Sequence, residues 1–162
     1  MRLTIDGRNV EAAEGMSILQ AAKTVGIEIP TLCYLEGISD IGSCRLCVVE
    51  VEGMNELATA CNTKAKEGMV VQTASERVIE ARKTVLKLLL SNHNIDCFNC
   101  EKNGDCELQK YCNIYGIDTT PYFGSRGLLE CEIPKKDAHP FLSYDQSKCI
   151  YCQRCVQTCR VA

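Results

Sequence analysis

Cysteine is the residue type that dominates the chemistry of this chain, because 13 of the 162 residues are cysteines and most of them stand in three groups with short gaps. Thiolates spaced in this way are ligands for zinc and iron, whereas disulfide frameworks are typical of exported proteins. The N-terminal stretch MRLTIDGRNV lacks the apolar segment of a signal peptide, and the cysteine count is odd. The pattern therefore favours metal binding in a reducing compartment, and we expect a cytoplasmic protein.

The first group has the spacing C-x10-C-x2-C-x13-C. Its members are Cys33, Cys44, Cys47 and Cys61. Four thiolates in two pairs match a [2Fe–2S] cluster, which takes one pair for each iron. Gly37 and Gly42 in the connecting loop let the backbone approach the sulfurs and direct N–H groups toward them. A structural zinc site also takes four cysteines, so the spacing alone leaves both metals open.

The second group has the spacing H-x3-C-x2-C-x5-C. Its members are His93, Cys97, Cys100 and Cys106. A neutral imidazole in place of one thiolate makes an iron–sulfur cluster less negative by one charge, which favours the reduced state. A zinc site with one histidine and three cysteines uses the same ligands, and a histidine at a helix C-terminus is also favourable against the helix dipole. The second histidine, His139, has no cysteine near it and is an ordinary linker residue.

The third group has the spacing C-x2-C-x2-C-x3-C. Its members are Cys149, Cys152, Cys155 and Cys159. In two-cluster bacterial ferredoxins the fourth cysteine of this run ligates the other cluster, so a further [4Fe–4S] site here is incomplete by itself. We expect the chain to be part of a longer polypeptide; the alternatives are completion by Cys159 or a stray cysteine, or an empty site.

Two cysteines remain outside the three groups. Cys112 and Cys131 are expected to be small buried apolar side chains, because most free cysteines are. The alternative is that one of them replaces a ligand of the third cluster.

The predicted secondary structure that positions these residues changes near residue 75. Before it, Asp6-Gly7 predicts a β-hairpin, and Ser17 predicts the N-cap of a helix over 18–25 that stops at Gly26. Three further stretches predict strands, namely VVEVEG (48–53), ELATAC (56–61) and MVVQTA (69–74). Four or five strands with one helix predict an α+β fold of the ubiquitin-like, β-grasp type.

From Ser75 the apolar residues recur at helical spacing and predict a helix of about four turns that ends close to His93. Short helices and loops follow. The predicted organisation is a β-grasp domain, a small helical domain with the histidine-containing group, a linker and a partial bacterial ferredoxin motif. Their ranges are 1–74, 75–130, 131–144 and 145–162.

These motifs together resemble known iron–sulfur proteins. The ligand loop on a hairpin–helix–hairpin scaffold resembles plant-type [2Fe–2S] ferredoxins, although their first gap is C-x4-C and the gap here is ten residues. The longer gap, followed by HNIDCFNC and CIYCQRCVQTC, resembles the N-terminal iron–sulfur region of three families. These are the bacterial complex I large subunit, iron-only hydrogenase and the alpha subunit of NAD-linked formate dehydrogenase. The resemblance covers essentially the whole chain.

The resemblance implies a [2Fe–2S] cluster on the first group, a [4Fe–4S] cluster with one histidine and three cysteine ligands on the second, and a second [4Fe–4S] cluster on the third. It further implies electron transfer between a flavin/NAD-binding diaphorase-type subunit and a catalytic subunit of hydrogenase, formate dehydrogenase or complex I type, in a hetero-oligomer. No residue is a candidate acid, base or nucleophile, so the chain alone is not expected to be a complete enzyme.

Other function classes fit the sequence less well. A structural zinc-binding assembly module is the alternative to electron transfer. A thiol redox enzyme would use Cys44-x-x-Cys47 or Cys97-x-x-Cys100, but neither pair opens a helix after a strand. The formal net charge of −3 gives no broad footprint for nucleic acid, and the longest apolar block, TVLKLLLS, is too short to span a bilayer.

Overall fold

The computed structural model describes residues 1–118, 120–122 and 145–162. The predicted linker, Cys131 and His139 lie outside these residues. The described chain divides into two compact units, one made of Met1–Val85 with Cys152–Ala162 and one made of Leu86–Tyr151. In the described ranges, no helix has both the length and the apolar character needed to cross a membrane.

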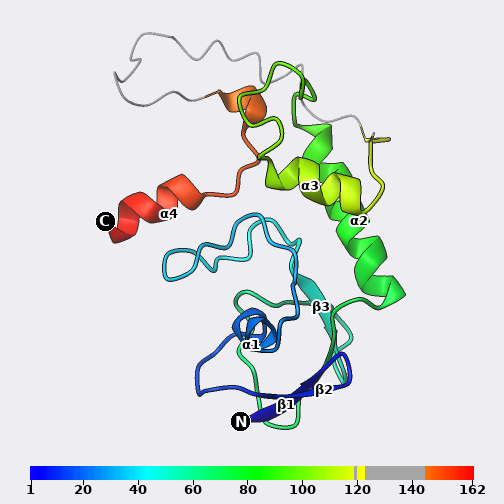
Figure 1. Ribbon diagram of the computed structural model, residues 1–162, viewed down its shortest axis with the longest axis vertical. Coiled ribbons are helices and arrows are strands. Elements are labelled where there is room, and N and C mark those ends of the chain that lie inside the picture. Colours follow the sequence, from blue (N-terminus) through cyan, green and yellow to red (C-terminus); the bar gives the residue numbers. More distant parts are fainter. Residues whose placement is uncertain (119, 123–144) are drawn as a thin grey trace. The chain divides into compact units, whose positions relative to one another are not determined.

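A five-stranded mixed sheet organises the first unit (Figure 1). Its strands are β1 (Arg2–Ile5), β2 (Arg8–Glu11), β3 (Val48–Val51), β4 (Ala58–Thr59) and β5 (Val70–Gln72). Their order is β2-β1-β5-β3-β4, with β1 and β5 parallel and the other pairs antiparallel. The predicted hairpin is confirmed: Asp6 and Gly7 have φ values of 47° and 76°, as a two-residue type I′ turn requires.

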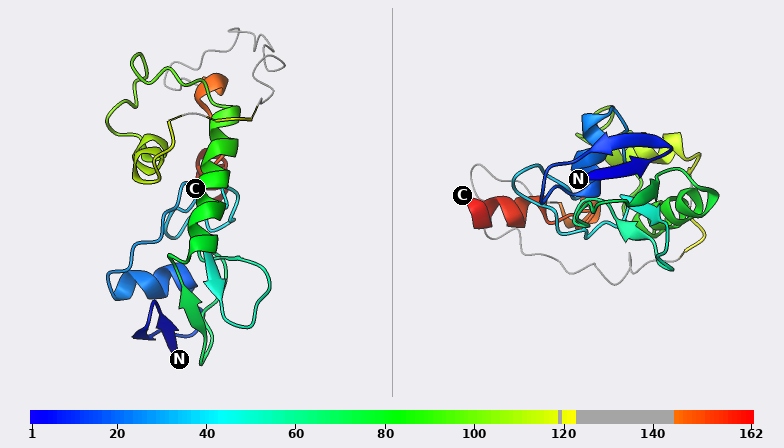
Figure 2. Two further views of the ribbon diagram at one scale, coloured as in Figure 1. Left: turned by 90° about the vertical axis from the view of Figure 1, so that its right-hand side faces the viewer. Right: turned by 90° about the horizontal axis from the view of Figure 1, so that it is seen from below.

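Helix α1 (Ile18–Thr24) lies against this sheet (Figure 2). Ser17 caps it as predicted: the Ser17 Oγ accepts from the Gln20 N–H at 3.2 Å, and the Gln20 Oε1 accepts from the Ser17 N–H at 2.9 Å. Gly26 follows the helix with a φ of 73°. The predicted apolar face of α1 is buried in the core, except that Val25 at the C-cap is only partly buried. Sheet and helix together enclose one apolar core.

Helix α2 (Glu76–Ser91) has the predicted start and length. The Ser75 Oγ accepts from the Val78 N–H at 3.3 Å at its first turn. A stripe of side chains four residues apart is buried along α2, namely Val78, Arg82, Leu86 and Leu90. Within the first unit, Nη2 of Arg82 donates to the Val48 carbonyl at 2.8 Å, which ties the start of this helix to strand β3.

Three short elements complete the described chain. Helix α3 (Glu107–Ile114) and the 3₁₀ turn η2 (Gln146–Lys148) belong to the second unit, and helix α4 (Arg154–Val161) lies in the C-terminal segment. The sequence analysis made no prediction of secondary structure for this C-terminal segment.

Candidate metal centres

The first predicted ligand group is assembled in the first unit. All four thiols are buried, with Cys33, Cys47 and Cys61 about 1% exposed and Cys44 8% exposed. The Cys33 thiol interacts with those of Cys44 and Cys61, and the Cys47 thiol interacts with that of Cys61. The Cys44 N–H also donates to the Cys33 Sγ at 3.5 Å. Four cysteines spread over 29 positions of the sequence therefore lie in one buried region of the first unit.

The proximity of these thiols shifts their protonation. Hydrogen bonds from the Cys44 and Cys61 thiols hold the pKa of Cys33 far below that of an ordinary thiol. The same hydrogen bonds, together with burial, raise the pKa values of Cys44 and Cys61. The hydrogen bond from Cys61 lowers the pKa of Cys47 to about 7. Since metals bind thiolates, binding of a metal cofactor here would release the protons that Cys44 and Cys61 retain.

The loop before β3 has the backbone conformation that a close approach of the backbone to the cysteine sulfurs requires. At Gly42, φ is 64° and an added Cβ would lie 2.9 Å from the Asn62 side-chain nitrogen. Gly37 has a φ of 73° but open space around it, so its role is conformational freedom rather than close packing. Arg45, between Cys44 and Cys47, also has a positive φ of 58°. Positive φ values of this kind turn backbone N–H groups toward an anion or an iron–sulfur cluster.

Helix α1 holds the loop that carries Cys61. The N–H groups of Ile18 and Leu19 donate to the carbonyls of Thr63 and Ala60, both at 2.9 Å. The fourth predicted ligand is thus fixed by the first turn of a capped helix.

The second predicted group is assembled in the second unit. His93, Cys97, Cys100 and Cys106 line a single recess. His93 follows the end of α2, where its N–H donates to the Leu90 carbonyl at 3.2 Å. Cys106 is the N-cap of α3, and its Sγ accepts from the Gln109 N–H at 3.5 Å. The two outer predicted ligands therefore lie at the end of one helix and the start of the next, and the loop between them carries Cys97 and Cys100.

The recess contains further side chains that the sequence pattern did not single out. They are Asn94, Asp96, Lys102, Asn103, Gln109 and Lys148. Lys148 is the one that comes from a distant part of the sequence, and no local pattern marked it.

The third group is divided between the two units, with Cys149 in the second and the other three cysteines in the segment Cys152–Ala162. The Cys149 Sγ accepts from the Tyr151 N–H at 3.4 Å. Cys155 and Cys159 lie one turn apart on α4, and both are exposed. A cluster at these residues stays a prediction.

Of the two cysteines outside the three groups, Cys112 lies in the described part of the chain and Cys131 does not. Cys112 on α3 is buried, and burial raises its pKa to about 11, as expected for a structural thiol.

All twelve cysteines that the structure describes are free thiols. Among the described residues, no three or more His, Cys, Asp or Glu side chains are grouped closely enough to hold a single metal ion. The assignment of iron–sulfur clusters therefore depends on the ligand types, their burial and the similarity to known proteins.

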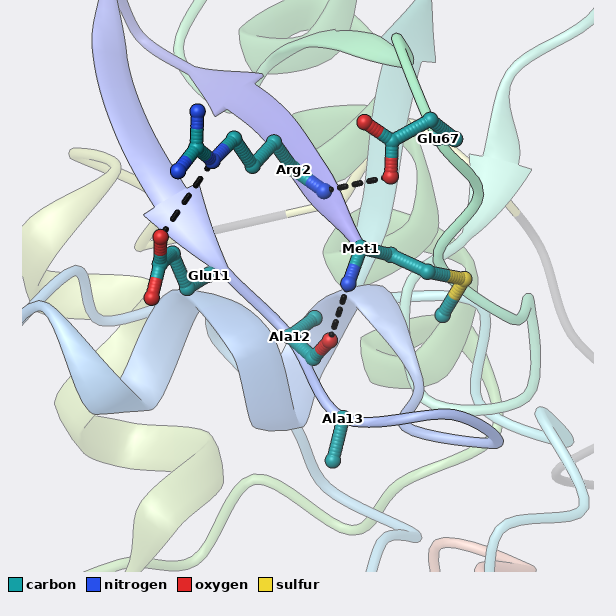
Figure 3. A pocket seen from close by; sticks show the side chains of 6 residues that line it. All are labelled: Met1, Arg2, Glu11, Ala12, Ala13 and Glu67. Carbon is teal, nitrogen blue, oxygen red and sulfur yellow. Dashed lines mark hydrogen bonds and ion pairs between the residues drawn. The ribbon is translucent and has the colours of Figure 1, made fainter.

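A larger hollow, of about 570 Å³, lies at the edge of the sheet near the N-terminus (Figure 3). The Met1 amino group donates to the Ala12 carbonyl there at 2.9 Å, and Arg2 contacts Glu11 and Glu67. Neither cysteine nor histidine lines this hollow, so it is not a candidate metal centre.

Two family models match consecutive segments of the chain. Residues 1–76 match the 2Fe-2S iron-sulfur cluster binding domain, and residues 82–121 match the NADH-ubiquinone oxidoreductase-G iron-sulfur binding region. The first segment contains the first cysteine group, and the second contains His93 with its three cysteines. The predicted [2Fe–2S] and [4Fe–4S] cofactors are confirmed at the level of these segments, and the zinc alternative gains no support.

Relatives match nearly the whole chain. It is 48% identical to the NADP-reducing hydrogenase subunit HndD of Solidesulfovibrio fructosivorans, over 99% of this chain and 29% of that protein. It is 38% identical to the NADH-ubiquinone oxidoreductase 75 kDa subunit of Reclinomonas americana, over 94% of this chain and 22% of that protein. A crystal structure of an NAD+-reducing [NiFe]-hydrogenase in the H2-reduced state matches with a TM-score of 0.80 at 28% identity, over 99% of this chain and 66% of that one. The chain thus spans less than a third of either curated relative.

Proposed function

We propose that this chain is an electron-transfer module, because residues 1–76 match the 2Fe-2S iron-sulfur cluster binding domain and residues 82–121 match the iron-sulfur binding region of NADH-ubiquinone oxidoreductase-G. One observation carries the proposal. Four buried, interacting thiols lie in the first segment, and a recess lined by one histidine and three cysteines lies in the second. Two such groups in one chain provide for two redox centres.

The proposal assigns a ligand set to each cluster. The [2Fe–2S] cluster is held by Cys33, Cys44, Cys47 and Cys61. The [4Fe–4S] cluster is held by His93, Cys97, Cys100 and Cys106. Each bound cluster supplies a reversible one-electron change. The chain's own residues do the rest: burial excludes water from the first site, backbone N–H groups stabilise its thiolates, and the neutral imidazole reduces the negative charge at the second.

The architecture supports the same assignment. The strand order β2-β1-β5-β3-β4 with α1 on one face fits the β-grasp fold of [2Fe–2S] ferredoxins. The proposed domain ranges are 1–74 and 75–130, followed by the linker 131–144 and the partial ferredoxin motif 145–162. In the last of these, Cys149, Cys152, Cys155 and Cys159 are proposed to hold a further [4Fe–4S] cluster.

The proposed role is relay of electrons between a flavin/NAD-binding subunit and a catalytic subunit. The relatives are named as subunits of NADP- or NADH-linked oxidoreductases, which supports a hetero-oligomer. Two of the matches are hydrogenases, so the proposal favours a hydrogenase over a formate dehydrogenase as the catalytic partner. The cytoplasm remains the proposed location, because the thiolate ligands require a reducing compartment.

The test is the amount of iron, zinc and acid-labile sulfide per chain after anaerobic purification, together with the electron paramagnetic resonance (EPR) spectrum of the reduced protein. One [2Fe–2S] and one [4Fe–4S] cluster give about 6 iron atoms per chain, and a filled third site gives about 10. Zinc without sulfide would refute the electron-transfer function.

A matched pair of variants tests the histidine. His93→Ala should lose about 4 iron atoms per chain, because a [4Fe–4S] cluster needs four ligands. His139→Ala, which removes the other histidine, should keep the full iron content. Equal iron content in the two variants would show that His93 is not a ligand.

A further inference from the structure

Lys148 lies at the His93 recess although it belongs to none of the predicted ligand groups. Its Nζ donates to the carbonyls of Asn94 and Asp96, both at 3.2 Å. A third hydrogen bond joins the same two segments, because the Asn94 N–H donates to the Ser147 carbonyl at 2.9 Å. The loop between His93 and Cys97 is thus attached to a segment more than 50 residues further along the chain.

The turn that carries Lys148 is itself ordered by hydrogen bonds. The Asp145 carboxylate accepts from the Ser147 N–H at 2.9 Å and from the Ser147 hydroxyl at 2.7 Å. The Lys148 N–H donates to the Asp145 carbonyl at 3.2 Å, which closes the 3₁₀ turn. The lysine side chain is half-buried and starts from a fixed backbone, so its position at the recess is defined at both ends.

The charge of Lys148 is presented differently from that of Lys102, the other lysine of the recess. Lys102 pairs with the Asp105 carboxylate at 3.3 Å, and its side chain is 70% exposed. The Lys148 ammonium instead donates to two neutral backbone carbonyls. Lys148 also interacts with the charge of the Asp145 carboxylate, but it forms none of the ion pairs found among the described residues. Lys148 therefore brings more of its positive charge to the recess than Lys102, which is paired directly with Asp105 and is screened by water.

A positive charge at this place has an electrostatic consequence. Reduction adds one negative charge to an iron–sulfur cluster, and a nearby cation stabilises the more negative state. The same ammonium also crosslinks two carbonyls of the loop that joins His93 to Cys97. Removing the side chain would leave the loop less constrained and the cluster without that cation.

We propose that Lys148 is a positioning residue for the His-ligated [4Fe–4S] cluster, whose ammonium fixes the His93–Cys97 loop and raises the reduction potential of the cluster. The inference depends on the proposed function, since it requires a cluster at His93.

The experiment is an EPR-monitored redox titration of the cluster-loaded 162-residue chain and three variants. Lys148→Met removes the charge at similar length, Lys148→Arg keeps it, and Lys102→Met removes the neighbouring charge as a matched control. The [2Fe–2S] cluster in the same molecules serves as an internal reference. At the wild-type midpoint, Lys148→Met should lower the ratio of reduced to oxidised [4Fe–4S] cluster by about three- to tenfold, and a tenfold change is 59 mV for one electron.

The controls separate this effect from general damage. Lys148→Arg and Lys102→Met should each change the ratio by less than about twofold. An unchanged ratio in fully loaded Lys148→Met would overturn the proposal, and so would an equal shift in Lys102→Met. If Lys148→Met does not hold the cluster, retention of iron by Lys148→Arg supports the role of the cation, and loss of iron from both variants contradicts it. A wild-type chain that lacks the His-ligated cluster would refute the proposed function instead.

Discussion

Exchange of His93 for cysteine tests how the second centre sets its potential. The change replaces a neutral imidazole with a thiolate, which adds one negative charge to the cluster and disfavours its reduction. In Rieske centres, two histidines in place of two thiolates accompany a rise from about −400 mV to between about −150 and +300 mV, or roughly 125–350 mV for each ligand. His93 is half-buried and is followed by the exposed residues Asn94 and Ile95, so water screens part of the added charge. We therefore expect His93→Cys to lower the potential by about 100 mV, just below the lower end of this range.

The geometry of the site decides how fully the variant is loaded. The His93 N–H is bonded to the Leu90 carbonyl at the end of α2, so the backbone at this position has little freedom to move toward the cluster. A cysteine sulfur reaches less far from the backbone than an imidazole nitrogen, and we expect incomplete occupancy in His93→Cys.

The assay combines an EPR-monitored redox titration with iron and sulfide analysis of the same sample. The shift is evaluated only for molecules that retain the cluster. A potential equal to or above that of the wild type in loaded His93→Cys would refute the charge argument. A [4Fe–4S] signal of wild-type form in His93→Ala would refute the ligand assignment itself.

Three further predictions concern the scaffold. Ser17→Ala removes the cap of α1 and should lower the free energy of unfolding in urea by about 1 kcal/mol, whereas Ser17→Thr, which can still cap, should lose clearly less; equal losses would contradict the capping role. Cys112 has a pKa raised to about 11, so only about one thousandth of it is thiolate at pH 8. Iodoacetamide should therefore label Cys112 slowly at pH 8, and the labelling rate should increase as the pH rises toward 11. Labelling of Cys112 at the rate of free cysteine at pH 8 would contradict this prediction. Gly42→Ala and Gly37→Ala both place an alanine at a positive φ, but only the Cβ added at position 42 meets a neighbouring side chain, at 2.9 Å. Only Gly42→Ala should therefore lose the iron of the [2Fe–2S] cluster. Equal iron contents in the two variants would contradict this account.

Much of the fold could be predicted because its signals are local. A two-residue turn depends on the conformational freedom of Asp6 and Gly7, and the starts of α1 and α2 depend on the hydroxyls of Ser17 and Ser75. Helix α4 carried no such signal. Its N-cap, Gln153, has a left-handed conformation and makes no side-chain capping bond, so nothing in the sequence marks where this helix begins.

The ligand groups could also be predicted, because metal coordination imposes recurring short gaps between ligands. The residues around the ligands could not. Lys148 meets the His93–Cys97 loop through backbone carbonyls, which every residue possesses, so the contact leaves no trace in residue type. The hydrogen bond from Arg82 to the Val48 carbonyl is hidden for the same reason, because its acceptor is also a backbone carbonyl.

The two proposed centres depend on the fold in different ways. The first is embedded in a sheet and helix with one continuous apolar core, and its thiols are at most 8% exposed. The second sits on a loop in which Cys97 is exposed and Phe98 is 91% exposed. Few side chains of the second unit are buried, namely Leu86, Leu90, Ser91, Leu108, Cys112 and Ile117 among those the structure describes.

Such a small core contributes little free energy, so we infer that the loop of the second centre is ordered mainly by the proposed bonds between ligands and metal. Small metal-binding domains whose folding is coupled to metal binding behave in this way. In that situation each hydrogen bond that restrains the loop reduces the conformational entropy lost when the cluster binds. Three hydrogen bonds act on this loop and not on the sheet: the Asn94 N–H donates to the Ser147 carbonyl, and the Lys148 ammonium donates to two carbonyls of the loop. We therefore expect Lys148 to have a larger effect on cluster binding at the second centre than any single non-ligand side chain has at the first.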